Sequence, residues 1–176
     1  MATAPVYARP GTDEYAPFYQ TYVAKVPNDN LVALLEAGAG ELDRLFDLPE
    51  ARGNHAYAPG KWSLKEVLGH LIDAERVFSY RALVFGRGDA GPLPPFDENA
   101  WIPESGFGAR TLADLRAEFR AVRAATVSLF AHFPPEAPTR TGVASGKTVS
   151  VRALGYIIAG HALHHAAVVR ERYLNT

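Results

Sequence analysis

Cysteine is absent from the 176-residue sequence, and this absence excludes several kinds of chemistry. Without cysteine the chain has no disulfide bond, no thiolate ligand for a metal ion and no cysteine nucleophile. The sequence also lacks a hydrophobic leader and any uncharged apolar run of the roughly 18 residues that a membrane-spanning helix needs. We therefore expect a soluble protein that works in the cytoplasm.

An excess of charge of either sign is also missing. The chain has 18 Lys and Arg residues against 19 Asp and Glu residues, and its formal net charge is −1. Because the basic residues are scattered, we expect neither a nucleic-acid-binding surface nor a surface for anionic membranes. A small-molecule substrate is the expected partner.

What is present is the composition of one globular domain. Hydrophobic residues make up 48% of the chain and charged residues 21%, which is an ordinary globular balance. A chain of this length can bury a substantial core, so we expect one domain over residues 1–176. Residues 1–28 contain four prolines and four tyrosines. We expect them to form an irregular arm against the body, with one helical turn near residues 15–24.

Four later segments repeat apolar residues with the period of an α-helix, and each follows a residue that favours helix N-caps. They are 30–46 after Asn28 or Asp29, 64–85 after Ser63, 112–133 after Thr111 and 151–173 after Ser150. In the second, Glu66 at the third helical position completes a capping box with Ser63. There are no internal repeats and no convincing strands. The predicted fold class is therefore all-α, a four-helix bundle.

Residues 86–110, between the second and third of these segments, are rich in glycine, proline and aromatic residues. A stretch of that length inside a compact domain is usually functional or a crossover connection. We predict that it crosses the end of the bundle and lets the second and third helices run parallel. The helix order is then up-down-down-up, with short links elsewhere.

Three of the six histidines lie within residues 161–165, on the last predicted helix. On a helical wheel of about 100° per residue, His161 and His165 both point into the middle of the apolar face, whereas His164 lies at its margin. Imidazoles at the centre of an apolar face need partners, and a metal ion can use two at once. A pair one turn apart also arises by chance. The alternative is two neutral rings satisfied by neighbouring side chains or water.

A third histidine, His70, lies at the edge of the apolar face of the second helix. Three histidine ligands with an open position are typical of a catalytic metal centre rather than a closed structural one. The residues alone therefore leave two interpretations of the histidines, a metal site and a set of unmetallated rings.

Two longer motifs contain these histidines. Residues 61–76 (KWSLKEVLGHLIDAER) resemble the signature of the DinB-like (DinB/YfiT) family of metal-binding four-helix bundles. Residues 160–174 (GHALHHAAVVRERYL) resemble the C-terminal signature of that family. The resemblance extends over residues 19–174 and includes residues 96–99 (FDEN) of the crossover.

The resemblance implies one divalent transition metal ion, most often zinc or nickel, bound by His70, His161 and His165. Water or substrate completes the coordination. It also implies hydrolases and thiol S-transferases or isomerases, the latter with a low-molecular-weight thiol as co-substrate. His164 is adjacent and competes for the role of His165, but the helical wheel favours His165.

Charged residues near the histidines have two interpretations each. Glu66 lies one turn before His70 and would fix its tautomer, but the capping box competes for that carboxylate and is favoured; Asp73 is the alternative acceptor. Arg81 and Arg123 lie at core-facing edges of their helices. For both, a buried ion pair with a carboxylate is favoured over an anion contact to a substrate carboxylate or thiol cofactor.

In the crossover, Phe96 and Trp101 either cover the metal site or close an end of the bundle. The last helix also has a second, largely small-residue face that carries Tyr156, Leu163 and Leu174. Such a face is typical of a helix packed on both sides, and it suggests a homodimer as one hypothesis.

Three functions remain open from the sequence. The first is an enzyme whose metal ion activates a water or a thiol. Since no carboxylate is placed beside the histidines by spacing, we expect no dedicated general base. The second is a non-catalytic metal-binding or small-molecule-binding module of a stress response. The third keeps the fold and leaves the histidines without a metal.

Overall fold

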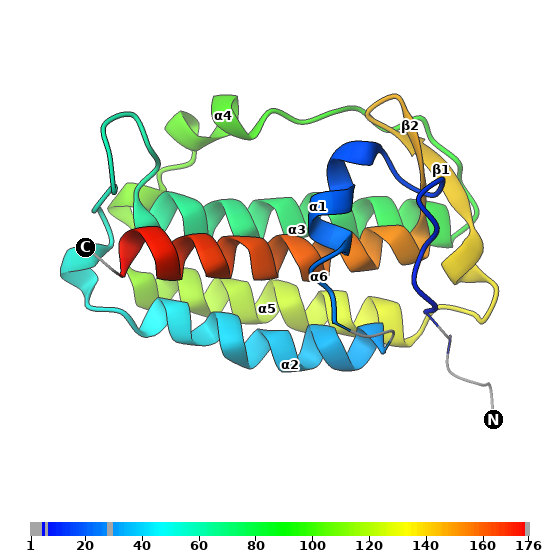
Figure 1. The fold of residues 1–176 in the computed structure, drawn as a ribbon, viewed down its shortest axis with the longest axis horizontal. Coiled ribbons are helices and arrows are strands. Elements are labelled where there is room, and N and C mark those ends of the chain that lie inside the picture. The colour runs from blue at the N-terminus through cyan, green and yellow to red at the C-terminus, as the bar shows by residue number, and fades with distance from the viewer. Residues whose placement is uncertain (1–4, 6, 28–29, 175–176) are drawn as a thin grey trace.

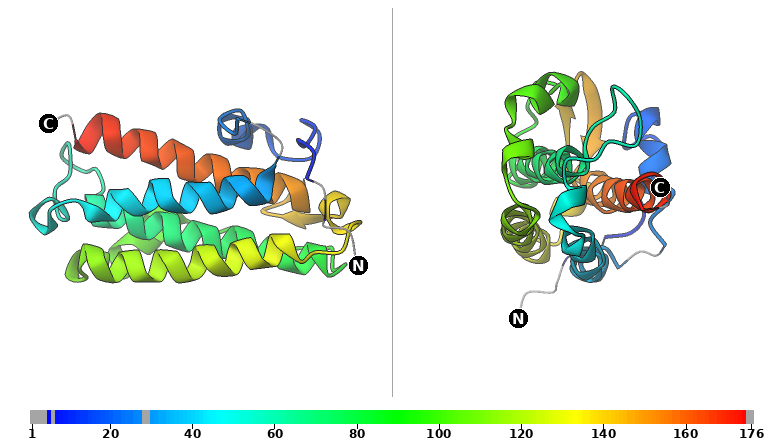
Figure 2. Two further views of the ribbon diagram at one scale, coloured as in Figure 1. Left: turned by 90° about the horizontal axis from the view of Figure 1, so that it is seen from below. Right: turned by 90° about the vertical axis from the view of Figure 1, so that its left-hand side faces the viewer.

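The computed structural model describes residues 5, 7–27 and 30–174. Four long helices form its body: α2 (Leu31–Asp43), α3 (Leu64–Gly86), α5 (Leu112–Ala131) and α6 (Val151–Val168). A π-helical turn, Val169–Tyr173, continues α6. Each long helix packs against two of the others, α3 and α2 both lying against α5 and α6 (Figure 2). None of the described helices combines the length and apolar character needed to cross a membrane.

The helix order is up-down-down-up, as predicted. In Figure 1, α2 and α6 run in one direction along the long axis, and α3 and α5 run in the other. The path of the crossover differs from the prediction, because it runs along the length of the bundle over α3 instead of across one end. Two parallel neighbours require this path, since the chain must return to the end at which the first helix began. The crossover contains α4 (Glu98–Trp101) and the 3-10 turns Ile102–Glu104 and Phe107–Ala109.

The helix starts follow the capping chemistry in the sequence. Ser63 accepts a hydrogen bond from Glu66 N (3.3 Å), and Ser63 N donates to Glu66 Oε2 (2.6 Å), so the capping box is complete. Thr111 and Ser150 also cap the helices predicted for them. The first long helix differs: its cap is Asn30, and the predicted caps Asn28 and Asp29 lie outside the described residues.

Buried apolar side chains form two clusters that follow one another along the bundle. On α3 the border between them falls between Ile72 and Ala74, and on α6 it falls between Ala159 and Ala162. The apolar core is thus divided at the level where the sequence has its histidines.

A short β-hairpin contradicts the expectation of no strands. β1 (Thr141–Ala144) pairs antiparallel with β2 (Lys147–Ser150), with Thr141 opposite Ser150 and Ala144 opposite Lys147. Ser145 and Gly146 between them both have positive φ, 53° and 71°, which is typical of a two-residue hairpin turn. Strands of four residues are too short to show a clear alternation of apolar and polar residues in the sequence. The Ser-Gly pair was the only sign of a turn at this position.

The hairpin holds the beginning of the crossover. Leu93 N donates to Val143 O (2.9 Å), Val143 N donates to Ala90 O (2.9 Å), and Ser145 N donates to Leu93 O (3.1 Å). These bonds attach residues 90–93 to the edge of β1. The crossover therefore leaves α3 along a defined line before it passes over the bundle.

The N-terminal arm has the predicted helical turn, as the 3-10 turn Pro17–Tyr19 followed by α1 (Gln20–Val23). It lies against α6 (Figure 1). Gly160 of α6 allows this contact, because a Cβ atom there would overlap the backbone carbonyl of Tyr22. Tyr156 is completely buried, and its hydroxyl donates to Tyr7 O (3.3 Å). The arm thus covers part of the second apolar face of α6; the homodimer stays a prediction.

The remaining links are longer than expected. The link from α2 to α3 contains the 3-10 turns Arg44–Asp47 and Glu50–Arg52, and the link from α5 to α6 contains the 3-10 turn Ala137–Thr139 and the hairpin. Both lie at the ends of the bundle.

Candidate metal centre

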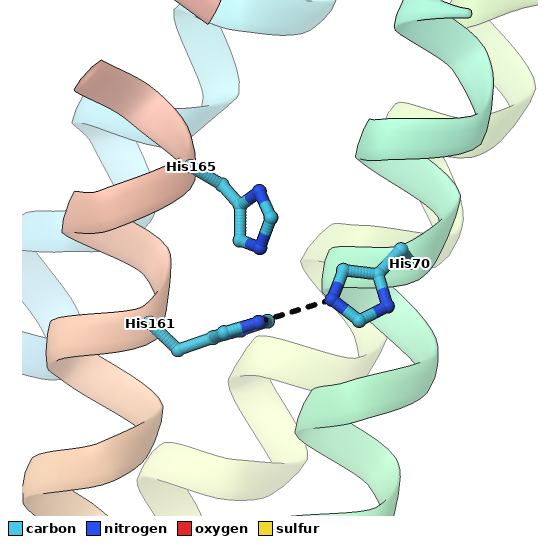
Figure 3. A group of neighbouring side chains, drawn as sticks. All are labelled: His70, His161 and His165. Carbon is cyan, nitrogen blue, oxygen red and sulfur yellow. Dashed lines mark hydrogen bonds between the residues drawn. The ribbon is translucent and has the colours of Figure 1, made fainter. Parts of the chain in front are cut away.

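Three histidines meet between α3 and α6. His161 and His165 lie one turn apart on α6 and point toward α3, where His70 faces them (Figure 3). One ring nitrogen from each residue can be chosen so that all three lie within 4.8 Å of one another. The Nε2 atoms of His70 and His161 are 3.1 Å apart, within hydrogen-bond distance. Two helices thus bring three imidazoles to one point, as the positions in the sequence predicted.

Burial keeps these rings neutral. It lowers the pKa of His70 to about 4, against a smaller opposing effect of the Glu98 charge. It lowers the pKa of His165 to about 3, with further lowering by the neighbouring histidines, and it holds the pKa of His161 well below its usual value. Neutral imidazole is the form that binds a metal ion through a ring nitrogen.

The donor set fits a divalent transition metal ion. A hydrogen bond between His70 and His161 would satisfy those two rings without an ion. The Nδ1 atom of His165, however, is buried and has no hydrogen-bond partner among the described residues. Leaving a buried polar atom unpaired costs about 1–3 kcal/mol. In Figure 3 this atom faces away from the other two rings, whereas Nε2 of His165 faces them. The three imidazoles that converge suit zinc, nickel and similar borderline ions.

His164 lies outside this group. Its half-buried ring contacts Tyr22, with ring centroids 5.4 Å apart. It lines a cavity of about 300 Å³ together with His165, Trp62 and Asn99. His164 is thus outside the group of three converging rings, although it shares this cavity with His165.

The histidines border open space on two sides. His165 reaches the cavity of about 300 Å³ just described. His70 and His161 line a second cavity, of about 120 Å³, beneath the arm and the crossover. The three rings therefore form a floor that a small molecule can approach. The sequence pattern that defines the DinB superfamily matches residues 34–169. The chain belongs to the DinB superfamily.

Solved structures with the same fold agree with this assignment. YfiT from Bacillus subtilis, described as a probable metal-dependent hydrolase with an unusual four-helix bundle topology, superposes with a TM-score of 0.76 at 16% identity, covering 92% of this chain and 93% of its own. A mycothiol-dependent maleylpyruvate isomerase superposes with a TM-score of 0.67 at 15% identity over 82% of this chain. This chain spans 61% of the isomerase. No curated protein sequence matches the chain closely.

Glu98 is a residue at the site of this DinB-superfamily chain that the sequence did not predict. The half-buried carboxylate lines the same cavity as His70 and His161. Its charge raises the pKa of His70, and it adds to the effect of burial in raising the pKa of Tyr22. Spacing in the sequence places no carboxylate beside the histidines, but the crossover brings Glu98 to their cavity. Glu98 follows Asp97, which caps α4 through bonds to Asn99 N and Ala100 N, and only the path of the crossover brings it to the site.

Aromatic rings surround the histidines. Phe96 lines the cavity at His161 and packs against Phe78, with centroids 6.0 Å apart. Trp101 packs on Phe96 (5.3 Å) but is 44% exposed and does not line that cavity. Of the two crossover aromatics, Phe96 covers the site and Trp101 supports it. Trp62, which the sequence did not single out, packs on His70 (5.0 Å).

Three other charged residues, Glu66, Asp73 and Arg123, have partners other than the histidines. Glu66 is engaged in the capping box, and Asp73 lies 3.6 Å from Arg76. Arg123 forms a bidentate ion pair with Glu75, with Nε–Oε1 and Nη2–Oε2 distances of 2.7 Å, and both side chains are buried. This is the buried pair favoured over an anion contact.

Arg81 differs from Arg123. It is equally buried, yet its Nη2 donates to Pro94 O (2.9 Å) and Ser145 Oγ (3.0 Å). Within the described part of the chain no carboxylate forms an ion pair with it. The buried carboxylate pair favoured from the sequence is therefore wrong for Arg81.

Proposed function

We propose that the chain is a metal-dependent enzyme that acts on a small molecule, of the hydrolase or thiol S-transferase type. His70, His161 and His165 would hold one divalent transition metal ion, with zinc or nickel favoured by the imidazole donors. The observation that carries the proposal is the convergence of three neutral imidazoles at a cavity floor. When bound, the ion supplies a lowered pKa for a water or thiol that it contacts.

The residues of the chain complete the proposed site. In this proposal the Glu98 carboxylate, which lines the same cavity, accepts a proton from the nucleophile and returns it to the leaving group. Phe78 and Phe96 keep water away from the part of the cavity next to His161. Three protein ligands leave coordination positions open for substrate. The descriptions of YfiT and of the mycothiol-dependent isomerase support the two reaction types. A reduced thiol co-substrate also suits the cytoplasmic location predicted from the sequence.

Metal analysis tests the proposed site. Protein without a histidine tag, purified without chelators, is expected to contain about one equivalent of a transition metal. His70→Ala and His161→Ala are each expected to lose it, whereas the matched control His164→Ala should keep it. Wild-type protein with no transition metal, or loss of the metal from His164→Ala alone, would contradict the ligand assignment.

Activity screening separates the enzyme from the non-catalytic binding module. Esters and amides test for hydrolysis, and reduced low-molecular-weight thiols with electrophiles test for transfer. We expect turnover in one of the two panels, lost on removal of the metal and restored on its return. A protein that binds the metal fully but turns over neither panel would favour the binding module.

A further inference from the structure

Arg81 is a buried positive charge that forms no ion pair with any of the described residues. Its side chain is 3% exposed, and it donates hydrogen bonds to the carbonyl of Pro94, the hydroxyl of Ser145 and the phenol of Tyr19. Its guanidinium also lies over the rings of Phe78 and Phe96, 5.9 and 5.6 Å from their centroids. Arg123, also 3% exposed, shows the usual solution, a bidentate pair with a carboxylate. A buried guanidinium is unfavourable unless an anion compensates it. The aromatic rings compensate part of the charge, and no carboxylate of the described residues forms an ion pair with it, so its charge is available to an anionic ligand.

A groove runs past Arg81 and can hold such a ligand. It lies between α3 and the crossover and has a volume of about 420 Å³, which is within the range of small-molecule sites. Apart from its charged residues, its walls are apolar and flat, formed mainly by Tyr80, Pro94, Pro95 and Trp101. Such walls suit a planar hydrocarbon body.

The other charged residues of the groove determine where the negative charge of a ligand would lie. Arg76 lies 2.5 Å from Glu118 and 3.6 Å from Asp73, so its charge is already compensated. Asp73 also lines the groove and repels an anion at its own position. A bound anion therefore belongs at Arg81, where the positive charge has no ion-pair partner among the described residues.

Arg81 also connects the groove to the metal centre. Ser145, which accepts its hydrogen bond, lines the cavity that contains His70 and His161. Phe96 lines both that cavity and the groove. We propose that the groove binds a small carboxylic acid with a planar apolar body, whose carboxylate accepts hydrogen bonds from Arg81 next to the histidines. As a substrate class this rests on the proposed function, but the binding itself requires no metal.

The test compares an acid with its neutral analogue. Calorimetric titrations of 2-naphthoate and 2-naphthamide are run on metal-free and on zinc-loaded protein. Wild-type protein is expected to bind the acid about tenfold more tightly than the amide in both forms. Arg81→Gln is expected to lose this preference while it still binds the amide. Arg76→Gln, the matched control from the same groove, should keep the preference.

A second variant covers the case in which Arg81→Gln does not fold. Ser145 is exposed at the hairpin turn, and Ser145→Ala should weaken acid binding about threefold without changing amide binding. Equal affinity for the two probes, no binding of either at millimolar concentration, or a preference that survives in both variants would overturn the proposal. A protein that prefers the acid but never holds a metal would contradict the proposed function alone.

Discussion

At the scale of single residues, Glu98 is the carboxylate that shares a cavity with His70 and His161. It lies 28 positions from His70 and 63 from His161 in the chain, yet all three line one cavity. The histidines were identifiable because helical spacing relates residues on one face. No comparable rule relates a residue in an irregular crossover to a helix that it passes over. The motif at residues 96–99 therefore indicated the family and did not show where Glu98 lies relative to the histidines.

Replacing Glu98 tests its role in proton transfer. Glu98→Gln keeps the size of the side chain and removes the proton acceptor, so kcat for the substrate found by screening is expected to fall about 100-fold. Metal content should stay unchanged. Glu104→Gln, an exposed glutamate on the same crossover, is the control and should be indistinguishable from wild type. Unchanged turnover in Glu98→Gln would exclude this role.

The buried histidines also predict how stability depends on pH. Burial lowers the pKa of His70 from 6.5 to about 4, so the unfolded chain binds more protons than the folded chain between these values. The stability of metal-free protein should therefore be full above pH 6.5 and fall as the pH drops toward 4. For His70 alone, the loss is at most about 3 kcal/mol.

Urea unfolding of metal-free protein across this pH range measures the effect. His70→Ala should show a shallower dependence on pH than wild type. His132→Ala, which changes an exposed histidine, should keep the wild-type slope. A wild-type stability that is flat from pH 7 to pH 4 would contradict neutral burial of these rings.

At the scale of elements, the four long helices could be predicted and the parts between them could not. Helices can be predicted from N-cap residues, such as Ser63, Thr111 and Ser150, and from the 3.6-residue period of their apolar residues. The hairpin and the crossover depend instead on contacts distant in sequence, such as Leu93 with Val143. The same is true of the candidate site. The convergence of the three histidines could be predicted, whereas the positions of Glu98 and Phe96 next to them could not.

The contact of the arm with α6 gives a prediction at this scale. Gly160→Ala introduces a methyl group where the Tyr22 carbonyl lies, so the arm must move and the protein should lose about 1–3 kcal/mol. The arm should also be cleaved faster by protease while the four long helices stay protected.

Gly40→Ala is the matched control for this substitution. Gly40 also lies in a long helix, but a Cβ atom there would meet nothing within 4 Å. Alanine is the better helix former, so Gly40→Ala should stabilise the protein by about 0.5–1 kcal/mol. If both alanine variants have the same stability, the close packing of the arm on Gly160 is wrong.

At the scale of the whole molecule, polar groups divide the core. The Glu75–Arg123 pair and the three histidines lie near the border between the two apolar clusters. A polar layer of this kind lowers the apolar burial available for stability. The middle of the bundle, where the candidate site is located, therefore has less apolar packing than the two clusters on either side of it.

Removing one partner of the buried ion pair tests how this layer is balanced. Arg123→Met leaves the Glu75 carboxylate buried and unpaired and is expected to cost about 3–5 kcal/mol in urea unfolding. The double variant Glu75→Leu/Arg123→Met should recover most of the loss. Arg120→Met, which breaks the exposed pair with Asp43, should cost less than about 1 kcal/mol. If Arg123→Met is as stable as wild type, the Glu75–Arg123 pair does not stabilise the fold.

The way the crossover passes over α3 has a consequence for how new specificities can arise. The histidines belong to α3 and α6, whereas Glu98, Phe96 and the apolar walls of the groove belong to a connection held at its start by hydrogen bonds to β1. Sequence changes in the connection alter what is recognised and leave the donors of the metal centre in place. Exchange of this one segment between members of the superfamily is thus a direct way to change which ligand binds beside unchanged metal donors.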